Sequence, residues 1–185
     1  MDAQKRARFL EICRERSFER KRVVLASGRE SDFFIDCKQT ILTAEGHALS
    51  GELLFELLAE LPECDAVGGV ELGGCPLASA VSLVSFQRGR PLPALYVRKE
   101  RKDHGSAKLV EGDKSLFPGI RVVLLEDVIT TGGSSLRAVE ALKTVGANVV
   151  GIAALVDRLE GGAETIRQAG VPLVSLANRR DFMGD

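Results

Sequence analysis

Residues 122–135 read Val122-Val123-Leu124-Leu125-Glu126-Asp127-Val128-Ile129-Thr130-Thr131-Gly132-Gly133-Ser134-Ser135. An apolar, β-branched run of this kind is typical of a buried strand, and here it leads into two adjacent carboxylates. After Ser135 the apolar positions change to a helical period, at Leu136, Val139, Leu142 and Val145. The pattern therefore predicts a strand, a tight turn rich in glycine and hydroxyl groups, and a helix start.

The predicted turn has the composition of a phosphate site. Glycines let backbone N–H groups converge on an anion, hydroxyls add donors, and the helix N-terminus contributes the positive end of its dipole. A nucleoside-triphosphate loop would need a lysine after the second glycine, and Gly133 is followed by Ser134. Carboxylates would repel a polyphosphate, but they accept hydrogen bonds from sugar hydroxyls. The stretch thus predicts a ribose 5-phosphate site, with the hydroxyls on Glu126 and Asp127 and the phosphate on residues 130–134. A plain helix capped by Ser134 would explain only part of the pattern.

Length and composition limit the class of protein. The 185 residues suffice for one α/β domain with a substantial core, and a formal net charge of −1 argues against a general nucleic-acid binder. No apolar run reaches the length of a membrane span, and residues 1–6 lead into no signal-peptide core. The four cysteines are scattered, which is typical of reduced thiols rather than of zinc ligands or disulfides. We expect a cytoplasmic, single-domain protein that binds neither nucleic acid nor membrane.

Strand and helix patterns alternate along the chain. Helices are predicted at residues 2–16, 43–61, 76–84 and 136–145 with a short one after 161–162, and strands at 22–25, 32–38, 65–70, 93–97, 122–125, 149–156 and 171–176. This alternation predicts an α/β fold, a mostly parallel twisted sheet with helices on both faces. Ligands of such sheets bind at the carboxyl ends of the strands. The segments expected to converge there are 71–74, 98–99, 126–134 and 157–158. The glycine pair at 73–74 fits either a second anion site or a simple packing turn.

A basic segment, residues 98–112, joins two predicted strands and is long for a loop in a compact domain. Charge runs of this kind often form a solvated hairpin. This segment leaves a strand end beside the predicted sugar-phosphate site, so its lysines can stabilise a departing diphosphate. We therefore interpret it as a mobile lid.

Two of these segments resemble known proteins. The run at 122–135 is similar to the signature with which phosphoribosyltransferases bind phosphoribosyl pyrophosphate (PRPP). Arg98-Lys99, Lys102 and His104-Gly105 form the pattern Arg-Lys-x-x-Lys-x-His-Gly, which resembles the catalytic loop of orotate phosphoribosyltransferases. The loop pattern is much more specific than the PRPP signature, which many relatives share.

Two further segments resemble the same branch of the family. Residues 25–36 are similar to the Ser-Gly-x-x-Ser-x-Phe/Tyr segment that forms part of the orotate pocket, and Asp157-Arg158 resembles a pair whose arginine contacts orotate. There are departures as well. Ala26 and Gly73 stand where some members carry lysines, so lysine contacts there are not implied, and Glu126 replaces the commoner aspartate.

The resemblance implies a type I phosphoribosyltransferase fold, with residues 1–185 as one domain and roughly the first 40 residues as a small N-terminal hood. It implies an enzyme in which a ring nitrogen of orotate displaces pyrophosphate from C1 of PRPP. The product is orotidine 5′-monophosphate (OMP), and the transition state has oxocarbenium character. Mg²⁺ is implied as cofactor, held mainly by substrate oxygens and not by a cluster of protein ligands. The implied active unit is a homodimer whose catalytic loop reaches the neighbouring subunit's site.

The resemblance also assigns roles to individual residues. Lys102 and His104 would meet the pyrophosphate as catalytic residues, and Asp127 would either assist proton movement or orient the ribose. PRPP would be bound by Arg98, Lys99, Lys102, His104, Glu126, Asp127, Val128, Ile129, Thr130, Thr131, Gly132, Gly133 and Ser134. Orotate would be bound by Ser27, Phe33, Phe34, Thr130 and Arg158.

Two rival functions stay open. A phosphoribosyltransferase for another base would keep residues 122–135, but it has no reason to carry the loop pattern or the segment at 27–34. A PRPP-sensing regulatory protein would keep the phosphate turn and add a nucleic-acid surface. The near-neutral charge and the lack of a further domain argue against that regulator.

Overall fold

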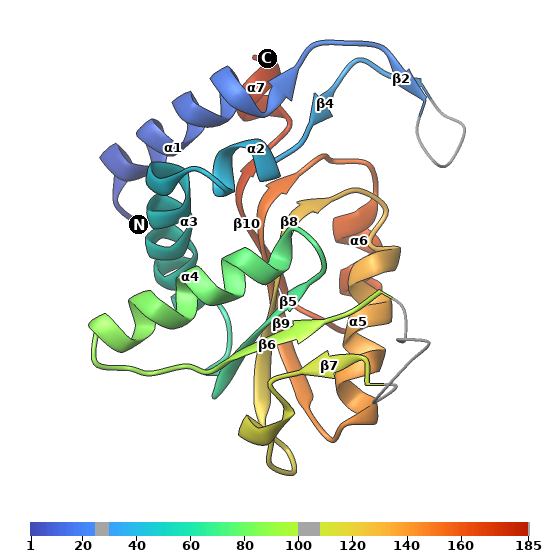
Figure 1. The fold of residues 1–185 in the computed structure, drawn as a ribbon. Helices are drawn as coiled ribbons and strands as arrows, with labels where there is room; N and C mark the ends of the chain where they lie inside the picture. The colour runs from blue at the N-terminus through green and yellow to red at the C-terminus, as the bar shows by residue number, and fades with distance from the viewer. Residues whose placement is uncertain (25–29, 100–107, 185) are drawn as a thin grey trace.

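The computed structural model describes residues 1–24, 30–99 and 108–184. A six-stranded sheet in the order β10-β9-β8-β5-β6-β7 forms its centre, and helices cover both faces (Figure 1). The parallel strands are β5 (Ala66–Val70), β6 (Ala94–Val97), β8 (Arg121–Ile129), β9 (Asn148–Asp157) and β10 (Leu173–Asn178). At one edge β7 (Val110–Glu111) pairs antiparallel with β6. The predicted α/β class and mostly parallel sheet are confirmed.

The central strand β8 is buried on both faces, and its alternate side chains enter two separate cores. Val123 and Leu125 pack with residues of α1 (Ala3–Arg16), α3 (Ala44–Leu57) and α4 (Gly74–Gln87). Val122 and Leu124 pack with residues of α5 (Gly133–Thr144) and α6 (Gly162–Gln168). Because successive side chains of a strand point to opposite faces, the acids that follow along β8 are also divided between these faces.

The N-terminal segment lies across the carboxyl end of the sheet (Figure 1). In it β1 (Phe18–Glu19) pairs antiparallel with β4 (Phe34–Ile35), and β2 (Val23–Val24) pairs with β3 (Glu30–Ser31). The rings of Phe18, Phe33 and Phe182 contact one another with centroids 5.3–5.9 Å apart. Phe182 belongs to the short C-terminal helix α7 (Arg180–Met183), so both ends of the described chain pack together above the strands.

Several predicted elements are confirmed closely. The helix at 2–16 is α1, and the helix capped by Thr43 is α3, where Thr43 Oγ1 accepts a hydrogen bond from the Gly46 N–H at 3.0 Å. The strands predicted at 65–70, 93–97, 149–156 and 171–176 correspond to β5, β6, β9 and β10. A 3-10 turn, Leu58–Glu60, follows α3.

Other predicted bounds were wrong. Residues 32–38 do not form one strand, because the Asp36 carboxylate accepts from the Lys38 N–H at 3.2 Å and helix α2 (Lys38–Ile41) begins there. Helix α4 begins at Gly74 and not at Pro76. The strand predicted to end at Leu125 continues to Ile129, because β9 still pairs with it there. The short elements β7 and α7 were not predicted, since two and four residues carry no period.

Candidate active site

The acidic pair of β8 lies at an open edge of the sheet. Pairing between β5 and β8 ends at Gly69 and Leu125, whereas pairing between β8 and β9 continues to Ile129 and Asp157. Glu126 and Asp127 therefore lie beyond the last residues that pair β8 with β5, at the carboxyl ends of the strands. This is the edge at which ligands of parallel sheets bind.

Glu126 points to the α5 side and is only 5% exposed. Its Oε1 accepts a hydrogen bond from Ser135 Oγ at 2.9 Å. Burial, together with the neighbouring charge of Asp127, raises the pKa of Glu126 to about 8, although Ser135 and the charge of Lys99 act in the opposite direction. Glu126 is thus largely protonated at neutral pH and can donate as well as accept a hydrogen bond.

Asp127 points to the opposite side, toward the loop that precedes α4. Its carboxylate accepts from the Val128 N–H at 3.0 Å, and burial raises its pKa while the charge of Lys38 lowers it. Gly73 packs directly on this carboxylate, since a Cβ at Gly73 would lie 2.1 Å from Asp127 Oδ2. A Cβ at position 73 would therefore overlap the Asp127 carboxylate in this backbone.

The turn after β8 is shaped by its glycines and by contact with α6. Gly132 has a positive φ of 82°, which favours glycine, and a Cβ there would lie 3.0 Å from the Gly162 carbonyl. The Thr130 carbonyl accepts from the Gly162 N–H at 3.0 Å. These contacts fix the turn against the start of α6.

The first turn of α5 presents free backbone donors. Within the described chain the first helical N–H with an acceptor is that of Leu136, which donates to the Gly132 carbonyl at 3.0 Å. The N–H groups of Gly133, Ser134 and Ser135 precede it, and the first turn contains no acidic residue. Ser134 and Thr130 are half-buried and Thr131 is exposed. This arrangement suits an anion at the helix N-terminus.

The remaining residues of the predicted PRPP stretch play different parts. Val128 is half-buried, and Ile129 is a core residue that packs among the side chains of the α5 and α6 layer. Ile129 therefore can serve a ligand only through its backbone.

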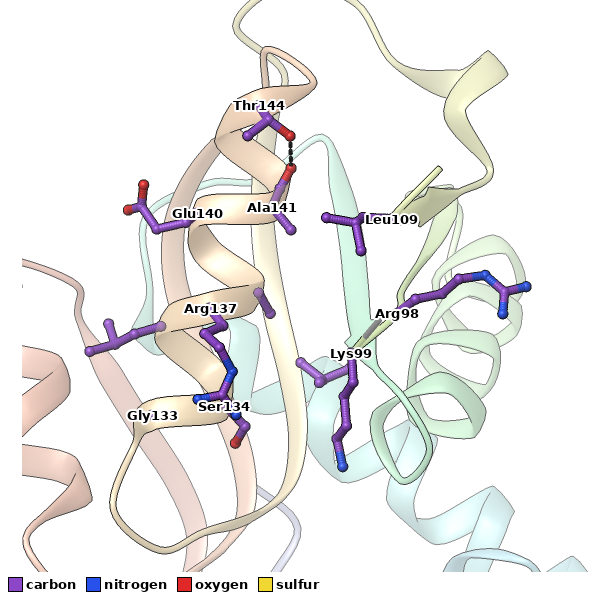
Figure 2. Close-up of a pocket in the computed structure, with 12 residues that line it drawn as sticks. Arg98, Lys99, Leu109, Gly133, Ser134, Arg137, Glu140, Ala141 and Thr144 are labelled. Carbon is purple, nitrogen blue, oxygen red and sulfur yellow. Dashed lines mark hydrogen bonds between the residues drawn. The ribbon is translucent and has the colours of Figure 1, made fainter. Parts of the chain in front are cut away.

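A cavity of about 490 Å³ opens beside the turn, between α5 and the ends of β5 and β6 (Figure 2). Lys99 follows β6, and its side chain extends to the same end of the cavity as Ser134. Its N–H donates to Glu71 Oε1 at 2.7 Å, which fixes the start of its segment against the loop that contains Gly73. Arg98 points away, and its Nε and Nη2 donate to Glu111 Oε1 at 3.0 and 2.9 Å. Of these two predicted residues, the structure brings only Lys99 to the turn.

Arg158 follows β9 and is buried, with 7% exposure. Its Nη2 donates to the Phe33 carbonyl at 2.8 Å and pairs with Glu160 at 2.9 Å. Its Nε is buried and has no acceptor among the described residues. A buried donor without a partner is costly, so this side of the guanidinium is suited to a ligand acceptor.

The two predicted phenylalanines lie in different surroundings. The Phe33 ring is fully buried in the aromatic cluster with Phe18 and Phe182, and Arg158 contacts this residue twice: its Cζ lies 5.6 Å from the ring centroid, and its Nη2 donates to the carbonyl. Phe34 is half-buried, and Lys21 Nζ lies 3.9 Å from the centroid of its ring. The predicted residues Ser27, Lys102 and His104 lie outside the described ranges.

The sequence analysis placed Glu71 at this edge but missed Lys38, Ser135 and Arg137 as site residues. Lys38 and Arg137 are brought there by the fold and not by a local pattern, whereas Ser135 ends the segment at 122–135 that was already singled out. Among the described residues, no group of three or more His, Cys, Asp or Glu could hold a metal ion. None of the helices in the described ranges is long and apolar enough to cross a membrane.

The chain is similar in sequence and in structure to proteins of one family. The phosphoribosyl transferase domain family matches residues 43–171. An orotate phosphoribosyltransferase of Sorangium cellulosum (strain So ce56) is 73% identical over 183 residues, covering 99% of this chain and 95% of that protein. An orotate phosphoribosyltransferase of Bradyrhizobium sp. (strain BTAi1) is 47% identical over 96% of this chain and 97% of its own length. The crystal structure of the Mycobacterium tuberculosis H37Rv orotate phosphoribosyltransferase in complex with PRPP matches with a TM-score of 0.78 and 38% identity, over 96% of this chain and 98% of that one.

This chain belongs to the phosphoribosyltransferase family. The fold and the site at the carboxyl edge of β8 agree with that membership. Within the family, the high identity over nearly the whole length places the chain among the orotate phosphoribosyltransferases, as the loop pattern at 98–105 predicted.

The surroundings of Gly73 and Gly133 predict a larger loss of stability for a substitution at Gly73 than for one at Gly133. Gly73 has helical backbone angles that alanine can adopt, so Gly73→Ala acts only through its Cβ and should destabilise the fold by about 1–3 kcal/mol. Gly133→Ala has an ordinary contact of 3.6 Å to Arg137 Nη1 and should change stability by less than about 1 kcal/mol. Urea unfolding of both variants measures the difference. Equal stability of the two would show that the loop before α4 adapts to a side chain.

The raised pKa of Glu126 predicts a pH-dependent stability. The folded state keeps a proton that the unfolded chain, with an ordinary pKa of 4.5, releases. This contribution to stability is therefore complete below pH 4.5 and is lost as the pH rises toward about 8. Glu126→Gln should gain stability over the wild type across this window, most at pH 8.5. Urea unfolding at pH 5.5, 7 and 8.5 tests this, with the exposed Glu164→Gln as control. A constant difference between wild type and Glu126→Gln at all three pH values would contradict it.

Proposed function

We propose that this protein transfers the 5-phosphoribosyl group of PRPP to orotate, forming OMP and pyrophosphate. The observation that carries the proposal is the junction of β8 and α5. There the free N–H groups of Gly133–Ser135 lie next to two carboxyl groups, the buried Glu126 and the half-buried Asp127. An anion site and a sugar-hydroxyl site in direct succession fit a ribose 5-phosphate. The 73% identity to a named orotate phosphoribosyltransferase supports orotate as the acceptor.

In this proposal the two acids bind the ribose differently. The 5-phosphate lies on residues 130–134, with the helix dipole and the hydroxyls of Thr130, Thr131 and Ser134 as further support. Glu126, largely protonated at neutral pH, exchanges hydrogen bonds with a ribose hydroxyl. Asp127, on the other side of β8, accepts from the neighbouring hydroxyl and stabilises positive charge as it develops at C1. The turn thereby fixes the sugar while the bond at C1 breaks.

Orotate is proposed to lie near Arg158. The guanidinium already uses Nη2 for the Phe33 carbonyl and Glu160, and its buried Nε remains for an acceptor on a planar carboxylate or imide. Ser27, Phe34 and the hydroxyl of Thr130 complete this part of the proposal. A buried pocket for the base excludes water that would otherwise hydrolyse the sugar.

The leaving pyrophosphate is proposed to meet cations of the segment that starts at Lys99. Lys102 and His104 lie outside the described ranges, so their roles rest on the sequence pattern. Mg²⁺ is the proposed cofactor and would neutralise charge on the pyrophosphate as it departs. The donor set fits this ion, because Mg²⁺ prefers substrate oxygens and retained waters to an all-protein cage. Glu126 and Asp127 point to opposite faces of β8, so they do not form such a cage. Asp127 is the carboxylate that could accept from a metal-bound water.

The proposed enzyme acts as a homodimer. Leu42 and Leu72 are 68% and 69% exposed, and with Tyr96 and Pro76 they line a cavity of about 370 Å³ on the α4 side. Exposed apolar side chains around a cavity are typical of an interface. Leu72 directly precedes Gly73, which packs on Asp127. A second copy on this surface would therefore lie beside the active site, and sharing of the segment at 100–107 between subunits is proposed from the sequence pattern alone.

The transfer reaction tests the proposed function directly. The wild type should convert PRPP and orotate to OMP in the presence of Mg²⁺, should stop when the metal is chelated, and should not use uracil, adenine or hypoxanthine. Lys102→Ala should lower kcat by roughly 10²–10³, as for loss of a transition-state donor. Lys108→Ala, whose lysine pairs with Asp113, is the matched control. Near-normal turnover of Lys102→Ala would remove this lysine from the mechanism, and preference for another base would replace orotate.

A charge on the apolar surface tests the dimer. Leu42→Glu should shift the protein from dimer to monomer in analytical ultracentrifugation and lower its activity, because a charge cannot be buried without a partner. Phe117→Glu, at a 53% exposed site away from this surface, should leave the dimer intact. A wild type that sediments as a monomer would refute the dimer, and a dimeric Leu42→Glu variant would move the interface elsewhere.

A further inference from the structure

Arg137, on the second turn of α5, points back toward the start of its own helix. Its Nη1 lies 3.6 Å from the position that a Cβ on Gly133 would take. Figure 2 shows the guanidinium beside Ser134, on the cavity that Lys99 also lines. The side chain is exposed. Within the described part of the chain Arg137 has no hydrogen bond or ion pair, so nothing described there accounts for this direction.

Electrostatics within the helix disfavour the observed direction. A cation is unfavourable near the positive end of a helix dipole, and the first turn of α5 has no acid to compensate it. Glu140, three residues later, would be the usual partner of Arg137. Glu140 instead pairs with Lys143 at 2.7 Å, and Figure 2 shows it pointing away from Arg137. The local helix therefore offers no reason for the guanidinium to lie over its N-terminus.

A bound phosphate would supply that reason. The free N–H groups of Gly133–Ser135 and the guanidinium of Arg137 lie at the start of α5, and Lys99 lines the same cavity from the opposite side. A guanidinium presents two parallel N–H groups that match two phosphate oxygens. We propose that Arg137 binds the 5-phosphate of PRPP and of OMP from outside the turn. This inference rests on the position of the 5-phosphate in the function proposed above.

The geometry favours the 5-phosphate over the diphosphate. Arg137 approaches Gly133, inside the turn proposed for the 5-phosphate, whereas Lys99 extends from β6 on the other side of the cavity. The 5-phosphate is present in substrate and product alike. A contact with it stabilises the ground state and the transition state equally, so its loss raises KM and leaves kcat nearly unchanged.

Three ligands, each containing a different part of the substrate or product, distinguish a contact with the 5-phosphate from a contact with the diphosphate. Calorimetry on the full-length protein would measure the Kd of OMP, which has only the 5-phosphate, of pyrophosphate, which has only the diphosphate, and of orotidine, which has neither. Arg137→Met should weaken OMP by about 10- to 100-fold, the size expected for a charge-assisted hydrogen bond. Pyrophosphate and orotidine should bind as to the wild type. Arg137→Lys should recover part of the OMP affinity, and the KM for PRPP should rise with kcat unchanged.

The matched control is Lys143→Met, which removes a cation from the far end of the same helix. It should leave all three ligands unchanged. Wild-type OMP affinity in Arg137→Met would overturn the inference. A loss confined to pyrophosphate would assign Arg137 to the diphosphate and equally overturn it. A wild type that makes no OMP from PRPP and orotate would instead refute the proposed function, so the two failures are distinguishable before any variant is made.

Discussion

The site depends on one constraint, the unequal pairing of β8 with its two neighbours. On one side the pairing with β5 ends at Gly69, and on the other the pairing with β9 continues to Asp157. The longer partner keeps β8 extended for four residues beyond Leu125, so two acids are held in strand geometry at the edge of the sheet. Strand geometry in turn sends Glu126 to α5 and Asp127 to the loop before α4. A turn starting directly after Leu125 would have left both acids on a loop.

Holding the acids this way has an electrostatic cost. Burial raises the pKa of both groups, the charge of Asp127 adds to the shift of Glu126, which reaches about 8, and the charge of Asp36 adds to that of Asp127. Ser135, the Val128 N–H and the charges of Lys99 and Lys38 offset this cost in part. Sugar hydroxyls would offset it further, because they can donate to Asp127 and exchange hydrogen bonds with a protonated Glu126. The free protein thus keeps polar groups in an unfavourable environment that a ribose would relieve.

The sequence predicted what depends on local pattern. The apolar period of residues 122–125, the glycine turn and the alternation of strands and helices were enough for the fold class and for the family. Contacts between distant segments were not predictable, because no period connects Ser135 with Glu126 or Gly73 with Asp127. The same holds for Arg98, which turns to Glu111 on a strand of only two residues, and for Phe33, whose ring joins a core that includes the C-terminal helix. Ser27, Lys102 and His104 stay predictions from the sequence.

The two ends of the proposed substrate meet different kinds of protein group, and this difference fits the reaction. The 5-phosphate is proposed to face backbone N–H groups fixed by Gly132 and by the contact between Thr130 and Gly162. A rigid cradle of this kind holds the part of the substrate that stays bound throughout. The diphosphate, which must leave, is proposed to meet long cationic side chains such as Lys99, which can follow its changing charge. Binding at the fixed end keeps the ribose in place, so interactions that strengthen only as the bond at C1 breaks can act on the rate.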